Sequence, residues 1–104
     1  MKITVVKRGS EQEPGAIRVY GGRGSPLGNP HVMRNKSDAE RNRVCDLFEA
    51  DFPSAEHEAC CCSILKEANG RDIELECFCA PKRCHLDRVR GHLMNLIEKQ
   101  HELK

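Results

Sequence analysis

The sequence lacks an excess of charge of either sign, a long hydrophobic run and any internal repeat. Its 17 Lys and Arg residues nearly balance its 16 Asp and Glu residues, which leaves a formal net charge of +1. A dedicated nucleic-acid binder usually carries a strong basic excess, so nucleic acid is not an expected partner. No apolar run approaches the roughly 20 residues of a membrane-spanning helix, and the N-terminal residues lack the apolar stretch of a secretory signal peptide. We therefore expect a cytoplasmic protein without a membrane partner.

Length and composition predict one domain over residues 1–104. Of the 104 residues, 38% are hydrophobic, which is enough for a small core. Charged residues make up 32%, but both signs are interspersed, so extensive disorder is not expected. No low-complexity segment marks a second domain.

Cysteine is unusually frequent, with seven residues. An odd number without a signal peptide argues against a disulfide framework. In a reducing compartment, clustered cysteines more often bind metal, take part in chemistry or pack in the core. The seven fall into three groups: Cys45 alone, the run Cys60–Cys62, and Cys77, Cys79 and Cys84. The run lies in a predicted helix, so one or two of its members should be buried and at least one exposed.

Hydrophobic periodicity and turn signals predict six elements in the order β-β-α-α-β-α. They are strands over 2–7, 16–20 and 72–79, and helices from Ser37 to before Pro53, from Ser54 to Asn69-Gly70, and from about Cys84 to the C-terminus. The first helix begins with a capping-box pattern, in which Ser37 is followed three residues later by Glu40. A strand followed directly by a helix near the C-terminus favours an α/β fold with some parallel pairing.

Apolar residues at helical spacing predict the inner face of each helix. These residues are Val44, Leu47 and Phe48 in the first helix, Cys61, Cys62, Leu65 and Ala68 in the second, and Leu86, Val89, Leu93, Leu96 and Ile97 in the third.

The first motif with a functional pattern is a loop rich in glycine and proline that follows the second predicted strand. It reads Tyr20-Gly-Gly-Arg-Gly-Ser-Pro-Leu-Gly-Asn-Pro30. Such a loop can point several backbone N–H groups at one spot and bind an anion, and Arg23 adds a bidentate donor for phosphate or carboxylate. The loop is neither a Walker loop nor a dinucleotide fingerprint. The alternative is a tight turn that uses glycine and proline for shape alone.

The second motif reads Cys77-Phe-Cys-Ala-Pro-Lys-Arg-Cys-His85 and joins the third predicted strand to the last helix. Ligands of open α/β sheets bind beyond the carboxyl ends of the strands, so this turn is well placed for function. In one interpretation Cys84 is a thiolate stabilised by the start of the helix and by nearby Lys82 and Arg83. His85 then acts as an acid, a base or a hydrogen-bond donor.

Two other interpretations of the second motif remain open. Cys77, Cys79, Cys84 and His85 have the side chains of a zinc site, although the spacing C-x-C-x4-C-H is unusual for one. Alternatively, the cysteines are small buried hydrophobic residues and His85 hydrogen-bonds the turn.

Basic residues form two groups along the chain rather than one block. One surrounds the start of the first helix and the other the last helix: Arg34, Lys36, Arg41 and Arg43, and Lys82, Arg83, Arg88 and Arg90. If both converge on the loop that carries Arg23, they would attract a phosphate-bearing ligand. Otherwise they form a solvated face balanced by Asp and Glu.

Taken together, the two motifs resemble a family of small phage and bacterial domains of unknown function. Its members pair a Tyr-x-Gly-Arg…Ser-Pro-Leu-Gly-Asn-Pro loop with a Cys-x-Cys-x-Pro-x-x-Cys-His turn, and the match extends from about residue 3 to 97. The resemblance implies a single small Rossmann-like α/β domain, with a short mixed or parallel sheet and flanking helices, in which both motifs meet at one pocket. Phe78 stands where the family commonly has Trp, and Leu86 where it has Gly.

We therefore expect a pocket that binds a nucleotide-like or other phosphate-bearing small molecule, for which hydrolysis or group transfer is conceivable. The candidate catalytic residues are Cys84 and His85, and the candidate ligand-binding residues are Tyr20, Arg23, Ser25, Leu27, Gly28, Asn29 and Cys79. No acid/base pair is identifiable, so whether the protein is an enzyme stays open. Two alternatives are a phage-type accessory protein that binds a host protein, and a zinc-stabilised binding module.

Overall fold

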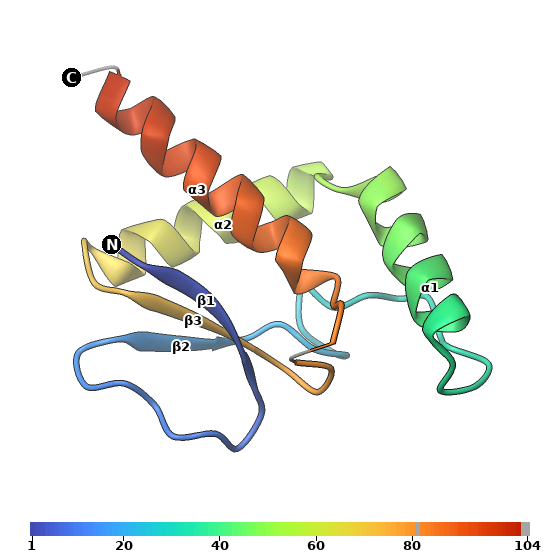
Figure 1. The fold of residues 1–104 in the computed structure, drawn as a ribbon. Coiled ribbons are helices and arrows are strands. Elements are labelled where there is room, and N and C mark those ends of the chain that lie inside the picture. Colours follow the sequence, from blue (N-terminus) through green and yellow to red (C-terminus); the bar gives the residue numbers. More distant parts are fainter. Residues whose placement is uncertain (81, 103–104) are drawn as a thin grey trace.

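A computed structural model describes residues 1–80 and 82–102, with the side chains of residues 1–80 and 82–100. Its six elements follow the predicted order (Figure 1). They are β1 (Ile3–Lys7), β2 (Ile17–Tyr20), α1 (Asp38–Asp51), α2 (Ala55–Ala68), β3 (Ile73–Cys77) and α3 (Leu86–Glu102). The α/β fold is therefore confirmed. Among the described residues, no helix combines the length and apolarity needed to cross a membrane.

The three strands form one sheet in the order β1-β3-β2, and both neighbouring pairs are parallel. Ile73 of β3 is paired with Ile3 on one side and with Ile17 on the other. Helices α2 and α3 lie on one side of the sheet, and the segment 8–16 that connects β1 to β2 crosses the other side (Figure 1). All three strands therefore end at the same edge, close to the two motifs.

The core lies between the sheet and the helices. Ile73, Leu75 and Cys77 alternate along β3 and are 0–1% exposed. From α3, the buried residues are Leu86, Val89 and Leu93, and from α2 they are Cys61, Ile64, Leu65 and Ala68. Because the helices cover only one side of the sheet, the opposite side needs a different cover.

Two predictions about the inner faces were wrong. Leu47 is 38% exposed and Cys62 is also exposed, whereas Cys45 and Ile64 are buried. The other predicted members of these two faces are buried, so in α1 and α2 one residue of each stripe is replaced by a neighbour that packs better against the adjoining elements. In the Cys60–Cys62 run, Cys61 is buried, Cys60 is partly buried and Cys62 is exposed, as expected.

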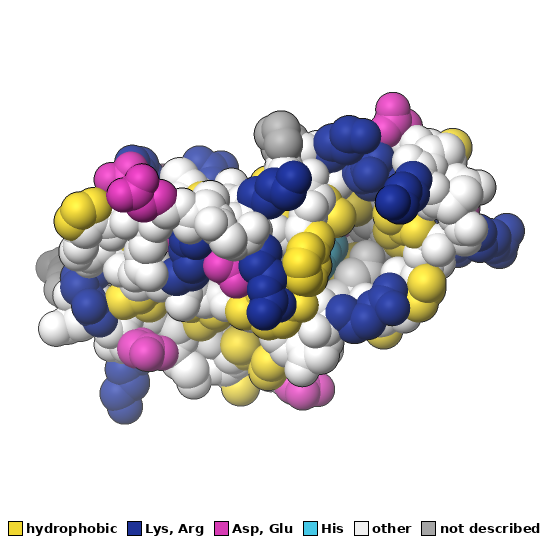
Figure 2. Space-filling model, turned by 90° about the horizontal axis from the view of Figure 1, so that it is seen from below, with side chains coloured by type: hydrophobic (Ala, Val, Ile, Leu, Met, Phe, Trp, Pro, Cys, Tyr) yellow, Lys and Arg dark blue, Asp and Glu magenta, His cyan; other side chains and the backbone are white. Residues whose placement is uncertain are grey.

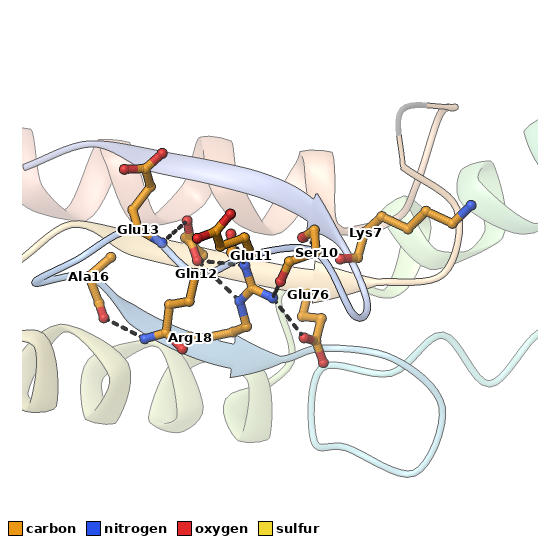
Figure 3. Close-up of polar contacts among 9 residues, drawn as sticks. Lys7, Ser10, Glu11, Gln12, Glu13, Ala16, Arg18 and Glu76 are labelled. Atoms are coloured by element: carbon orange, nitrogen blue, oxygen red, sulfur yellow. Dashed lines mark hydrogen bonds and ion pairs between the residues drawn. The ribbon is translucent and has the colours of Figure 1, made fainter.

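A buried ion cluster holds the segment 8–16 against the open side of the sheet. Arg18 of β2 donates hydrogen bonds to Glu74 from Nε (3.1 Å) and Nη2 (2.8 Å), and from Nη1 to Glu76 (3.3 Å). The same guanidinium donates to the backbone carbonyls of Ser10 and Glu11 in the connecting segment (Figure 3). This explains why acidic residues alternate with apolar ones along β3: both sides of the strand are covered.

The start of α1 departs from the predicted capping box. The Ser37 hydroxyl accepts the Glu40 N–H (3.2 Å) as expected. However, the Glu40 carboxylate accepts the Arg34 N–H (2.8 Å) and pairs with the Arg43 guanidinium, while the Ser37 N–H donates to Asn35. These contacts hold the pKa of Glu40 at about 2, mainly through the hydrogen bond from Arg43. They also fix the segment that leads from the first motif into α1.

Candidate functional site

A cavity of about 640 Å³ lies beyond the carboxyl ends of β2 and β3. Its walls come from both motifs, from the segment 31–36 and from the first half of α1. Figure 2 shows a hollow on this side of the molecule, with Lys and Arg side chains around it and a histidine within it. The volume lies within the range typical of small-molecule sites, about 300–1,000 Å³. The two motifs therefore meet at one cavity.

The glycine-rich loop is a closed turn. Both the N–H (3.1 Å) and the hydroxyl (2.7 Å) of Ser25 donate to the Gly22 carbonyl, and the Gly28 N–H donates to the Ser25 carbonyl (2.9 Å). A Cβ atom at Gly28 would lie 2.6 Å from the Gly22 oxygen, so only glycine fits there. Because the N–H groups of Ser25 and Gly28 are used inside the loop, they cannot form the anion-binding nest that the sequence suggested.

Only part of the predicted ligand-binding set lines the cavity. Arg23, Asn29 and Cys79 line it, whereas Tyr20, Ser25, Leu27 and Gly28 do not. Leu27 is 1% exposed and belongs to the core. The Tyr20 hydroxyl donates to the Arg23 carbonyl (3.1 Å) and so shapes the loop. These positions hold the loop in place, and Arg23 is the charged side chain that it presents to the cavity.

Asn29 fastens the loop to α1. Its side-chain N–H donates to the Val44 carbonyl (2.8 Å), and its side-chain oxygen accepts the His31 N–H (2.9 Å). Both the N–H group and the oxygen of the Asn29 amide are therefore engaged within the protein. Asn29 forms part of the cavity wall and sets the direction in which the chain continues toward the segment 31–36.

His85 connects the second motif to the first. Its Nε2 lies 2.9 Å from the Gly21 carbonyl oxygen, and its Nδ1 lies 3.6 Å from the Cys84 Sγ. Burial lowers the pKa of His85, so the ring is neutral at pH 7. A carbonyl can only accept, so Nε2 carries the proton and Nδ1 presents its lone pair to Cys84. The ring also packs edge-on against Phe48 at 4.9 Å.

Leu86, where the resembling family has glycine, does not intrude on the cavity. It is fully buried, and a Cβ atom at Gly21 would lie 2.5 Å from its Cδ2. The leucine side chain therefore packs against Gly21 in the core, next to the Gly21 carbonyl that His85 contacts.

Cys77 and Cys84 form a buried thiol pair on the cavity wall, 1% and 2% exposed. The hydrogen bond from Cys84, together with backbone N–H groups of Ala80 and Cys79, lowers the pKa of Cys77 to about 6. The same hydrogen bond, with burial, raises the pKa of Cys84 well above its usual range. The lowered pKa therefore belongs to Cys77 rather than to Cys84, for which the sequence suggested a thiolate.

The geometry gives no support to a zinc site. Among the side chains of residues 1–80 and 82–100, no three His, Cys, Asp or Glu residues are arranged to hold a metal ion. His85 also directs its Nε2 to the Gly21 carbonyl, which leaves that nitrogen engaged. Whether Cys84 and His85 act on a substrate stays a prediction.

The charge of the cavity wall is one-sided. Among the residues that the structure describes, no Asp or Glu lines it, and the basic side chains that do are Arg23, Lys36, Arg41 and Arg83. They come from both basic groups of the sequence and from the glycine-rich loop, so part of each group converges here. Potentials of one sign inside a cleft concentrate ligands of the opposite charge.

The four cationic side chains differ in how many ion pairs and hydrogen bonds they form with other protein groups. Arg83 pairs with Asp46 (2.9 Å) and Glu49 (2.6 Å), which ties the second motif to α1. Arg41 pairs with Asp38 through Nη1 (2.9 Å), while its buried Nε has no hydrogen-bond partner in the described part of the chain. The remaining two, Arg23 and Lys36, are exposed, and the ion pairs of the described residues do not include them.

A model of the family described as a domain of unknown function, DUF4326, matches residues 4–95. The chain belongs to the DUF4326 family. The resemblance that the two motifs indicated is thereby confirmed. Neither a curated protein nor a solved structure matches the chain.

This DUF4326 domain has wall residues that the sequence did not single out. Phe78 is 62% exposed, lines the cavity and contacts Tyr20 edge-on, with ring centroids 6.3 Å apart. The Arg8 guanidinium lies over both rings. Cys45 and Val44 of α1 also line the cavity. A signal for Phe78 was present, since the resembling family commonly has an aromatic residue at that position; the α1 residues depended on tertiary packing alone.

Proposed function

We propose that the DUF4326 domain binds a nucleotide-like, phosphate-bearing small molecule in the cavity between its two motifs. The observation that carries this proposal is the charge of the wall, where the described residues supply four basic side chains and no acidic one. A phosphate monoester carries up to two negative charges near pH 7 and accepts several hydrogen bonds. Such a ligand matches the wall in both charge and hydrogen-bonding character.

The unsatisfied cations indicate where the phosphate would bind. Arg23 and Lys36 are exposed, and Arg41 has a buried Nε without a protein partner. A phosphate that accepts from these groups would supply hydrogen bonds that the protein does not provide itself. Arg83 has a different role, because its pairs with Asp46 and Glu49 hold the wall together.

An aromatic side chain at the cavity favours a nucleotide over inorganic phosphate. Phe78 is largely exposed, while Tyr20 contacts it edge-on and the Arg8 guanidinium lies over its ring. An exposed and supported ring is a suitable platform for a nucleobase, since base–aromatic stacking contributes about 1–3 kcal/mol. Cys84 and His85 lie on the same wall, where they would flank the reacting group if the domain is a hydrolase or transferase.

The test is a calorimetric titration of the full chain with the four common nucleoside 5′-monophosphates, with the matching nucleosides as controls. We expect monophosphates to bind and nucleosides to bind at least about tenfold more weakly, because the charge-assisted hydrogen bonds are lost. The double variant Arg23→Ala/Lys36→Ala should lose most of the affinity. Lys66→Ala is the matched control, because Lys66 is an exposed lysine on α2 outside the cavity. Equal affinity of the double variant and the wild type would contradict the proposal.

A further inference from the structure

A second cavity, of about 390 Å³, adjoins the first one at the start of α1. The described residues that line it are Asp38, Arg41, Asn42, Lys82 and Arg83. Two of them, Arg41 and Arg83, also line the first cavity, so these two arginine side chains border both spaces. The second cavity therefore lies directly beside the proposed phosphate position.

The second cavity has a cation of its own. Lys82 is exposed and lines the second cavity but not the first. The ion pairs of the described residues do not include Lys82. Arg83 differs, because its Nη1 donates to Asn42 Oδ1 (3.0 Å) and its Nη2 pairs with Asp46 and Glu49. Lys82 is thus the side chain of this cavity whose ammonium donors are left for a ligand.

Arg41 lies at the boundary of the two cavities. Its side chain is largely buried, and its Nη1 donates to Asp38 (2.9 Å). Its buried Nε has no hydrogen-bond partner in the part of the chain that the structure describes. Asp38 is the one carboxylate among the described residues of the second cavity, and its charge is compensated by this pair with Arg41. A guanidinium carries five N–H donors in one plane, so Arg41 can serve acceptors on both sides.

We propose that the ligand of this domain carries a pyrophosphate group, as nucleoside 5′-diphosphates do. The phosphate next to the nucleoside binds in the first cavity, and the terminal phosphate lies beyond Arg41 in the second cavity, where Lys82 binds it. This inference rests on the proposed function, whose phosphate it extends, and it names the substrate class.

The shared arginine favours directly linked phosphates over the separate phosphates of a nucleic-acid strand. One guanidinium contacts both groups only if they lie close together, which is the case in a pyrophosphate. Consecutive phosphates of a strand are separated by a sugar. The formal net charge of +1 is also far from the strong basic excess that is typical of strand binders.

The test is a calorimetric titration of the full chain with the four common nucleoside 5′-diphosphates and the matching monophosphates. The buffer contains EDTA, so that no divalent cation compensates the phosphate charge. We expect the diphosphates to bind about tenfold more tightly, because the terminal phosphate gains charge-assisted hydrogen bonds. Lys82→Ala should reduce this preference to about twofold or less. Lys36→Ala is the matched control: Lys36 is an exposed lysine that lines only the first cavity, so both ligands should weaken and the preference should remain.

The outcomes separate this inference from the proposed function. If monophosphates bind but diphosphates bind no more tightly, the second phosphate position is wrong and the proposed function stands. An equal loss of preference in Lys36→Ala and Lys82→Ala would also overturn it, because the preference would then reflect total charge alone. Tighter binding of a 5′-phosphorylated dinucleotide than of any diphosphate would indicate a strand instead. If neither monophosphates nor diphosphates bind, both proposals fail. The preference of the wild type needs no variant, so the inference is tested even if Lys82→Ala fails to fold.

Discussion

His85 Nε2 lies 2.9 Å from the carbonyl oxygen of Gly21, 64 positions earlier in the chain. This one contact joins the two motifs that define the cavity. Gly21 can sit there because it has no side chain, since a Cβ atom would collide with Leu86. The neutral imidazole then serves both sides: its N–H satisfies the first motif, and its free nitrogen faces Cys84 in the second.

Replacing His85 by phenylalanine should destabilise the fold. The ring shape and the packing against Phe48 are kept, but the Gly21 carbonyl loses its donor inside the protein. Leaving a buried acceptor unsatisfied costs about 1–3 kcal/mol. Urea unfolding measured by circular dichroism should show a lower midpoint with an unchanged slope. An unchanged midpoint would mean that the contact contributes nothing to stability.

The same substitution should change how stability depends on pH. Burial lowers the pKa of His85 below 6.5, so below pH 6.5 the unfolded chain binds a proton that the folded chain does not. Stability contributed by the neutral ring is therefore present above pH 6.5 and declines as the pH falls below it. His85→Phe should remove this part of the decline. Unfolding curves at several pH values between 5 and 8 measure the difference; parallel profiles for both proteins would contradict it.

The ionisation of Cys77 can be measured directly. The thiolate absorbs near 240 nm, and the wild-type protein should show one thiol titrating at a pKa of about 6. In Cys84→Ser the donor is a hydroxyl rather than a thiol, and in Cys84→Ala it is lost. We expect the pKa of Cys77 to be higher in Cys84→Ala than in the wild type, because the largest cause of its lowering has been removed. A low-pKa thiol that persists in Cys77→Ser would show that another cysteine carries the charge.

Two glycine substitutions form a matched pair. Gly28→Ala places a Cβ atom 2.6 Å from the Gly22 carbonyl oxygen, which is backbone and cannot move aside cheaply. We expect a loss of about 1–3 kcal/mol, as for other overpacked sites. Gly91→Ala meets nothing within 4 Å in the interior of α3 and should gain about 0.5–1 kcal/mol. Thermal unfolding measures both, and the same sign for both variants would contradict the close approach at Gly28.

The ion cluster around Arg18 predicts an effect on both thermal stability and hydrogen exchange. Arg18→Met leaves Glu74 and Glu76 without their cation and removes the donor that holds the carbonyls of Ser10 and Glu11. The variant should unfold at a lower temperature, and the amides of segment 8–16 should exchange hydrogen faster. Arg8→Met is the control, because Arg8 is exposed and its guanidinium lies over the Tyr20 and Phe78 rings, outside the ion cluster. Unchanged exchange in Arg18→Met would mean that the cluster does not hold the segment.

Local signals predicted much of the fold, and packing decided the rest. The caps at Ser37 and Ser54 and the Asn69-Gly70 stop are encoded by neighbouring residues, and they set the helix bounds. The position of β3 between β1 and β2 is a long-range choice that no local pattern reveals.

At the candidate site, too, local sequence patterns predicted some features, whereas tertiary packing determined the others. The sequence identified both motifs and left two alternatives for the basic groups, and four basic side chains from the described residues line one cavity. It did not reveal which thiol has the lowered pKa, because the pKa of Cys77 depends on the Cys84 thiol and on the Ala80 and Cys79 N–H groups. Nor did it show that the Asn29 amide is fully used by Val44 and His31.

A ¹H–¹⁵N correlation spectrum of the labelled full chain, titrated with a nucleoside monophosphate, shows directly whether the cavity binds a phosphate-bearing ligand. We expect saturable shifts at the cavity wall, in residues 22–36, 41–45, 77–80 and 82–85, and few along the outer face of α2. We also expect these shifts to be lost in Arg23→Ala/Lys36→Ala while the spectrum stays dispersed. A dispersed wild-type spectrum that does not respond, or one that responds only away from the cavity, would contradict the claim that this cavity binds a phosphate-bearing ligand.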